Sequence, residues 1–212
     1  MESRSSGSAL KPSATWLMYL IYGLTAMMVI YFLTIKAFPK LVVSEAVYGD
    51  YYWPKAPWLF VHVVTGIFAT LIGPFQFVKR LRTNYVRGHR LFGFAYMVSI
   101  FLAALTAIYL AVYSGYNLMS KISLGIVPFI WIGTTGMAFA AAVKKRFDQH
   151  QEWMVRSYVV TLFFIAFVML DHYLPYSYFG TYEETLPLLT WACWAFPLFV
   201  TELILQGRKI FS

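Results

Sequence analysis

Six long runs of apolar residues constrain this chain more than any other feature. They fall at about 15–36, 57–78, 91–114, 122–143, 156–176 and 186–206. Each run approaches the roughly 20 residues that an α-helix needs to cross ~30 Å of hydrocarbon. Lipid offers no hydrogen-bond partner for an exposed backbone, so such spans are helical. We therefore predict an all-α fold, a polytopic bundle of six transmembrane helices.

The composition supports a membrane protein. The chain is 60% hydrophobic and 12% charged, whereas soluble domains are about 45–50% apolar and about 25% charged. Its single cysteine, Cys193, excludes an internal disulfide, a cysteine-based zinc site and a cysteine-ligated iron–sulfur cluster. The net charge is +8, and the basic residues that produce it lie mainly between the spans and near the two ends of the chain. This distribution is typical of membrane topology, so the predicted partner is the lipid bilayer and not nucleic acid.

The chain divides into three parts. Residues 1–14 form a polar, Ser-rich leader, residues 15–206 the six-helix domain, and residues 207–212 a short cytoplasmic tail. The first apolar run is too long for the core of a signal peptide, so we expect it to be retained as a span. The segment 37–56 is expected to be an external, aromatic-rich loop at the membrane interface.

The basic residues orient the predicted bundle. Thirteen of the 17 lie on one side: Arg4, Lys11, Lys79, Arg80, Arg82, Arg87, Arg90, Lys144, Lys145, Arg146, Arg156, Arg208 and Lys209. Loops rich in lysine and arginine remain in the cytoplasm. We therefore predict that both termini are cytoplasmic and that the protein resides in the inner cell membrane.

The four histidines fall into two pairs in this topology. His62 and His172, the outer pair, lie four to five residues inside the outer ends of their spans. His89 and His150, the inner pair, lie at or beside the cytoplasmic ends of theirs. The spacing of histidines therefore predicts one candidate site near each face of the membrane.

The outer pair predicts a haem b site with two histidine ligands, because neutral imidazole is a common axial ligand and facing helices are a usual place for the macrocycle. Gly66, one turn from His62, would make room for the porphyrin. Two alternatives remain open. Each histidine could hydrogen-bond a neighbouring carbonyl or Asp171, or His62, His172 and Asp171 could hold a divalent metal ion, since three such ligands suffice for zinc.

Around the inner pair the topology gathers polar and charged side chains: Gln76, Arg90, Trp153, Arg156 and Glu202. An ionisable residue inside a span is costly unless it is paired, so we expect Glu202 to bind Arg156 or Arg90. One interpretation is a site for a quinone-like or anionic head group, or for haem propionates on Arg90 and Arg156. The other is a salt-bridge cluster that fixes helix ends.

Three motifs follow His62 in the sequence, at 73–77 (GPFQF), 89–96 (HRLFGFAY) and 150–157 (HQEWMVRS). In this order and spacing they resemble a family of predicted bacterial multi-pass membrane proteins, domain of unknown function 2306, over spans two to six. The resemblance implies a membrane protein without a settled activity. The histidines also resemble, more loosely, those of diheme cytochromes b, whose ligands lie within spans. His89 and His150 fall at or beyond predicted span ends, which favours the outer pair as haem ligands.

The leading functional hypothesis is a membrane electron-transfer protein that binds haem b and exchanges electrons with a quinol or another redox partner. A membrane subunit or a small-solute or proton transporter without haem is the second hypothesis, because intramembrane ionisable residues also mark such paths. A metal-dependent membrane enzyme is the third. The sequence leaves the oligomeric state and the direction of electron flow open.

Overall fold

The computed structural model describes residues 12–174 and 179–211, and these form helices and no strand. Six helical segments in this part of the chain are long and apolar enough to cross a membrane, which confirms the predicted fold. The helices are α1 (Pro12–Tyr31), α2 (Glu45–Tyr52), α3 (Ala56–Ile72), α4 (Lys79–Asn84), α5 (Val86–Val112), α6 (Leu118–Val143), α7 (Phe147–Thr161), α8 (Phe163–Tyr173) and α9 (Tyr182–Phe211). Short π- or 3₁₀-helical turns are η1 (Phe32–Ala37), η2 (Phe38–Leu41), η3 (Trp53–Lys55) and η4 (Gly73–Phe77).

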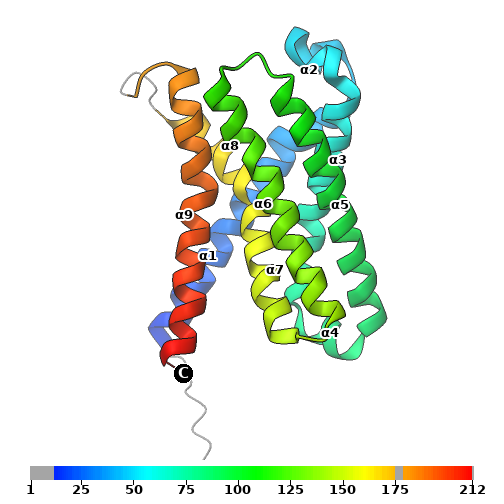
Figure 1. Cartoon of the computed structure of the whole chain (residues 1–212), viewed down its shortest axis with the longest axis vertical. Helices are drawn as coiled ribbons and strands as arrows, with labels where there is room; N and C mark the ends of the chain where they lie inside the picture. The colour runs from blue at the N-terminus through cyan, green and yellow to red at the C-terminus, as the bar shows by residue number, and fades with distance from the viewer. Residues whose placement is uncertain (1–11, 175–178, 212) are drawn as a thin grey trace, which may run out of the picture.

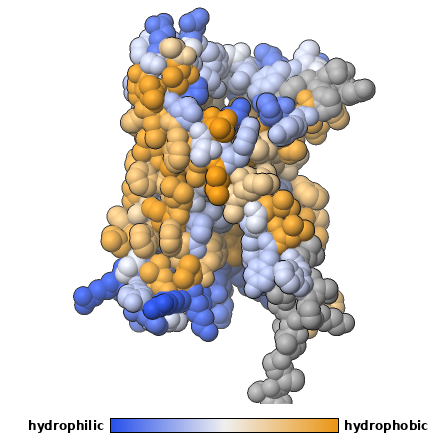
Figure 2. All heavy atoms as spheres, turned by 180° about the vertical axis from the view of Figure 1, so that it is seen from behind, coloured by the Kyte–Doolittle hydropathy of each residue, from blue (hydrophilic) through white to orange (hydrophobic). Residues whose placement is uncertain are grey.

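The long helices run between two ends of the molecule. The first turns of α1, the last turns of α9, and α4 lie at one end, and α2 lies at the other (Figure 1). We call the α4 end the basic end, because the segments 79–90 and 144–146 lie there. Seen from behind, apolar residues cover the middle of the molecule and hydrophilic residues gather at both ends (Figure 2). This is the surface that a membrane-spanning bundle requires.

Small residues bring α3 and α5 close together. Ala69 on α3 and Ala103 and Ala104 on α5 have no exposed surface. In lipid, where apolar burial does not drive helices together, such small side chains allow the close backbone contact that holds them. This contact places the main chain of α5 within reach of the His62 side chain.

The fifth span begins earlier than the sequence predicts. We expected it at 156–176, but α7 starts at Phe147 and continues through Leu162 into α8, which ends at Tyr173. The backbone N–H of Leu162 still donates to Tyr158 O at 3.0 Å, so the two helices follow one another with little interruption. His150, expected beside the end of this span, therefore lies inside its helix. Hydropathy locates an apolar run, but a helix extends beyond it wherever its polar turns keep their backbone hydrogen bonds.

The segment 37–56 contains helix where we expected a loop. Ser44 caps α2 by accepting a hydrogen bond from Val47 N at 3.4 Å, and Gly49 adopts a φ of +66° within α2. The side chain of Tyr48 is buried and donates to Lys40 O at 2.8 Å. The predicted leader lies outside the described residues as far as residue 11.

Candidate functional site

The inner pair is brought together by α5 and α7. The rings of His89 and His150 have centres 6.5 Å apart and planes at 89°. His89 lies in the first turn of α5 and His150 in the first turn of α7, both at the basic end. Both helices begin before their apolar runs, so the two rings meet at the polar starts of α5 and α7.

A main-chain carbonyl orients the ring of His150. Its Nδ1 lies 2.8 Å from Ala138 O on α6. A carbonyl only accepts, so Nδ1 donates, and in the neutral ring Nε2 is then the atom with a free lone pair. Histidines that bind metals are oriented in the same way, through a hydrogen bond from the other ring nitrogen.

His89 and Gln76 carry polar atoms without partners. Among the described side chains, His89 Nδ1 and Gln76 Nε2 are buried and make no hydrogen bond. Gln76 is only 5% exposed. Burying an unpaired polar atom costs about 1–3 kcal/mol, so each such atom calls for an explanation such as a bound molecule.

A pocket lies beside the inner pair. It has a volume of about 160 Å³ and is lined by Gln76, Phe77, Arg82, His150, Gln151, Met154 and Val155, which we call the inner pocket. A methyl group added at Gly93 would lie 3.2 Å from Gln76 Oε1, so the glycine makes room for this amide. Arg82 and Arg90 are close enough to His89 for their positive charges to act on its ring.

The three sequence motifs therefore converge on one place. Gln76 comes from the first motif, His89 and Gly93 from the second, and His150 from the third. Gly73, also in the first motif, allows a close helix contact, because a Cβ at this position would collide with the ring of Tyr158. Sequence reasoning named Gln76 and both inner histidines, but it left Arg82 in a general basic run and did not use Gly93.

The outer pair shows a different arrangement. His62 Nδ1 lies 2.9 Å from Ala103 O on α5, and its ring packs edge-on against Phe164 with centres 6.2 Å apart. His172 is exposed at the far end of α8, with its ring against Tyr173. Nothing lies within 4 Å of a Cβ added at Gly66, so this side of α3 is open beside His62.

A metal site at the outer pair is not assembled. Across residues 12–174 and 179–211, no group of three or more His, Cys, Asp and Glu side chains is placed to hold a metal ion. The predicted trio of His62, His172 and Asp171 is therefore not brought together. The three side chains stay apart because His172 is exposed at the end of α8, whereas the His62 ring is directed toward α5.

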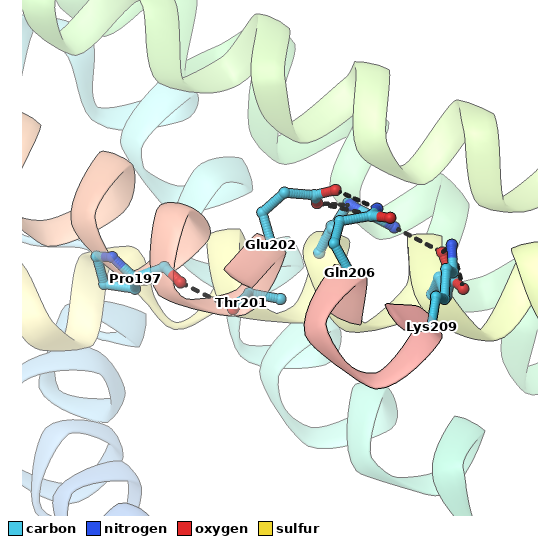
Figure 3. Close-up of polar contacts among 7 residues, drawn as sticks. Pro197, Thr201, Glu202, Gln206 and Lys209 are labelled. Atoms are coloured by element: carbon cyan, nitrogen blue, oxygen red, sulfur yellow. Dashed lines mark hydrogen bonds and ion pairs between the residues drawn. The ribbon is translucent and has the colours of Figure 1, made fainter. Parts of the chain in front are cut away.

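Glu202 pairs with Arg156, one of its two expected partners. Nε and Nη2 of Arg156 donate to Glu202 Oε2 at 2.9 and 2.7 Å, and the guanidinium lies 4.7 Å from the ring centre of Trp153. Glu202 Oε1 accepts from Gln206 at 2.6 Å, and Lys209 binds Glu152 at 2.8 Å. Figure 3 shows Glu202, Gln206 and Lys209 along α9 in this set of contacts, which we call the α7–α9 cluster.

The α7–α9 cluster is separate from the inner pocket. On α7, His150 and Met154 line the pocket, whereas Glu152 and Arg156 contact α9. The predicted quinone set is thereby divided, because Gln76 lies in the pocket while Trp153 and Glu202 belong to the cluster. Arg156 is engaged by carboxylates, so among the arginines Arg82 and Arg90 are the ones beside His89.

Sequence reasoning missed a buried network of hydroxyl groups. Tyr96 OH lies 3.0 Å from Ser157 Oγ and 2.9 Å from Thr161 Oγ1, and Trp131 Nε1 donates to Thr161 Oγ1 at 2.9 Å. Thr135 Oγ1 lies 2.7 Å from Ser157 Oγ. The signal in the sequence was the spacing of Ser157 and Thr161, four residues apart on an apolar helix.

Comparisons with known proteins give a family and no activity. The sequence profile of a family described as predicted membrane protein (DUF2306) matches residues 59–205. No curated protein and no solved structure matches the chain.

Proposed function

The chain belongs to the DUF2306 family of predicted membrane proteins, and we propose that it is an integral membrane electron-transfer protein that binds haem b through His89 and His150. The observation that carries this proposal is the inner pair itself. Its ring centres are 6.5 Å apart, and His150 is held by a carbonyl that leaves Nε2 unprotonated. The basic end is then expected to face the cytoplasm of the cell.

The spacing suits two ligands of one metal ion. With metal–nitrogen distances of about 2.0–2.1 Å, two imidazoles on opposite sides of an ion have ring centres roughly 6.4 Å apart. Nδ1 of His89 is buried and makes no hydrogen bond, which is consistent with a ring available to bind a ligand. Bound haem would supply reversible one-electron chemistry at this position.

The surrounding residues have distinct roles in this proposal. Ala138 O fixes the ring of His150, and Gln76 is buried beside Gly93 at the edge of the inner pocket that His150 also lines. Arg82 and Arg90 supply positive charge for carboxylates such as propionates. Haem held by His62 and His172, as expected from the sequence, stays a prediction, and space lies open at Gly66, one turn from His62.

The test is the reduced-minus-oxidised absorption spectrum of the purified full-length protein, expressed with added haem precursor. We expect a Soret band and an α band characteristic of iron with two histidine ligands. A protein that is folded by circular dichroism and shows neither band contradicts the proposal.

A proton path without haem is the second candidate, and the buried hydroxyl network favours it. Tyr96, Ser157 and Thr161 form a continuous set of hydrogen-bonding hydroxyls in the core, on the same two helices that carry the inner pair. Such intramembrane polar groups mark proton relays in transporters. This candidate predicts proton flux into liposomes that His150→Ala abolishes, together with a spectrum that lacks haem bands.

A further inference from the structure

We propose that the inner pocket binds the carbonyl-bearing ring of a quinone-class lipid. This inference rests on the proposed function and deepens it, because it names the class of small redox partner that the inner pair would serve. Three features of the pocket support it: the hydrogen-bond donors, the apolar walls and the position at the end of a span.

The amide of Gln76 provides a fixed donor that needs an acceptor. Its Nε2 is buried without a partner, while its Oε1 lies on the Gly93 side of the chain. The side chain is only 5% exposed, so bulk water does not replace the missing bond. A carbonyl oxygen of a ligand in the pocket would satisfy this donor.

The walls favour a neutral ring over a phosphate. Phe77, Met154 and Val155 are apolar, and Arg82 is the one cation among the residues that line the pocket. Phosphate sites gather several charge-assisted donors, whereas a quinone ring needs one or two donors and apolar faces. Gln151 is a further amide able to donate to a second carbonyl.

The size and position fit a head group whose tail stays in lipid. A volume of about 160 Å³ is below the roughly 300–1,000 Å³ of pockets that enclose whole drug-sized ligands. Gln76 and Phe77 end a segment able to span the membrane, Glu45–Phe77. An isoprenoid tail would therefore leave the pocket directly into the hydrocarbon region.

The experiment is an isothermal calorimetric titration. The full-length protein in lipid nanodiscs is titrated with a ubiquinone that carries one isoprenoid unit. The variants are Gln76→Leu, which removes the donor at similar size, and Arg82→Gln. Arg80→Gln is the matched control, because Arg80 belongs to the same basic segment but does not line the pocket.

We expect Gln76→Leu to raise the Kd at least about tenfold, since one hydrogen bond to a buried donor is lost. Arg82→Gln raises it by a smaller factor, and Arg80→Gln leaves it unchanged. Equal affinity of the parent and Gln76→Leu proteins, with both folded by thermal unfolding, overturns the proposal. Displacement of the quinone by millimolar inorganic phosphate also overturns it, since the pocket would then be an anion site.

The same titration on His89→Ala separates this proposal from haem binding. Quinone binding in that variant, when it contains no haem, supports the pocket independently of the proposed function. Loss of quinone binding in His89→Ala with Gln76 intact counts against the pocket as the binding site.

Discussion

At the scale of single residues, two histidines are held in the same way. His62 donates from Nδ1 to Ala103 O on a neighbouring helix, and His150 donates from Nδ1 to Ala138 O. In each case the main chain selects the tautomer and leaves Nε2 with a lone pair. The difference lies in what faces that ring, because His150 has His89 at 6.5 Å whereas His62 has Phe164.

Glycine at position 73 is required by packing. A Cβ there would collide with the ring of Tyr158 and lie 3.2 Å from the ring of Tyr96, so Gly73→Ala forces rigid aromatic side chains to move. We expect a loss of about 1–3 kcal/mol in the free energy of unfolding, as for other overpacked cores. Thermal unfolding of the purified variant in detergent measures it.

Gly66→Ala is the matched control for Gly73→Ala. Nothing lies within 4 Å of an added Cβ at Gly66 inside α3, so this variant should lose no stability and should gain up to about 1 kcal/mol, because alanine favours the helix over glycine. Equal losses in the two variants would show that the close contact at Gly73 is not what matters.

At the scale of helices, hydroxyl groups join α5, α6 and α7. Tyr96 on α5 binds Ser157 and Thr161 on α7, and Trp131 and Thr135 on α6 bind the same two residues. Each hydroxyl has a partner, as burial requires. This network links α5 to α7, the two helices that carry His89 and His150.

Tyr96→Phe tests that role. The change keeps the ring and removes the hydroxyl, and interhelical hydrogen bonds in membranes contribute about 0.6–1.7 kcal/mol. We expect the free energy of unfolding to fall by that amount. Tyr113→Phe, at an exposed position just after α5, should leave it unchanged, and an equal loss in both variants would argue against the network.

The α7–α9 cluster attaches the C-terminal part of α9 to α7. Arg156 is 9% exposed, but the side chain of its partner Glu202 is 45% exposed, so solvent weakens the pair. We expect a coupling energy of about 1 kcal/mol from a double-mutant cycle of Arg156→Gln and Glu202→Gln, measured by thermal unfolding. Additive effects of the two changes would mean that the pair does not couple α7 to α9.

At the scale of the whole molecule, the charge pattern predicts the direction of insertion. In a Cys193→Ala background, Leu118→Cys reports the α2 end and Lys144→Cys the basic end, since both positions are exposed. We expect a membrane-impermeant maleimide to label Leu118→Cys in intact cells and Lys144→Cys only after the cells are opened. The reverse pattern would invert the topology.

The sequence was sufficient for the number and order of spans, because hydrocarbon thickness sets a length that apolar runs reveal directly. It misplaced the starts of α5 and α7, since the turns around His89 and His150 are polar yet helical. The later predicted starts placed His89 and His150 at or beside the span ends, which favoured His62 and His172 as the haem ligands. Which rings face each other depends on helix rotation, and hydropathy does not report it.

Haem content of the four histidine-to-alanine variants tests the central claim most directly. Each variant is purified at full length, and its haem-to-protein ratio is measured from the reduced-minus-oxidised spectrum. We predict that His89→Ala and His150→Ala lose the haem bands of the inner pair, while His62→Ala and His172→Ala retain them. Bands that vanish only in His62→Ala and His172→Ala would contradict this account and assign the haem to the outer pair.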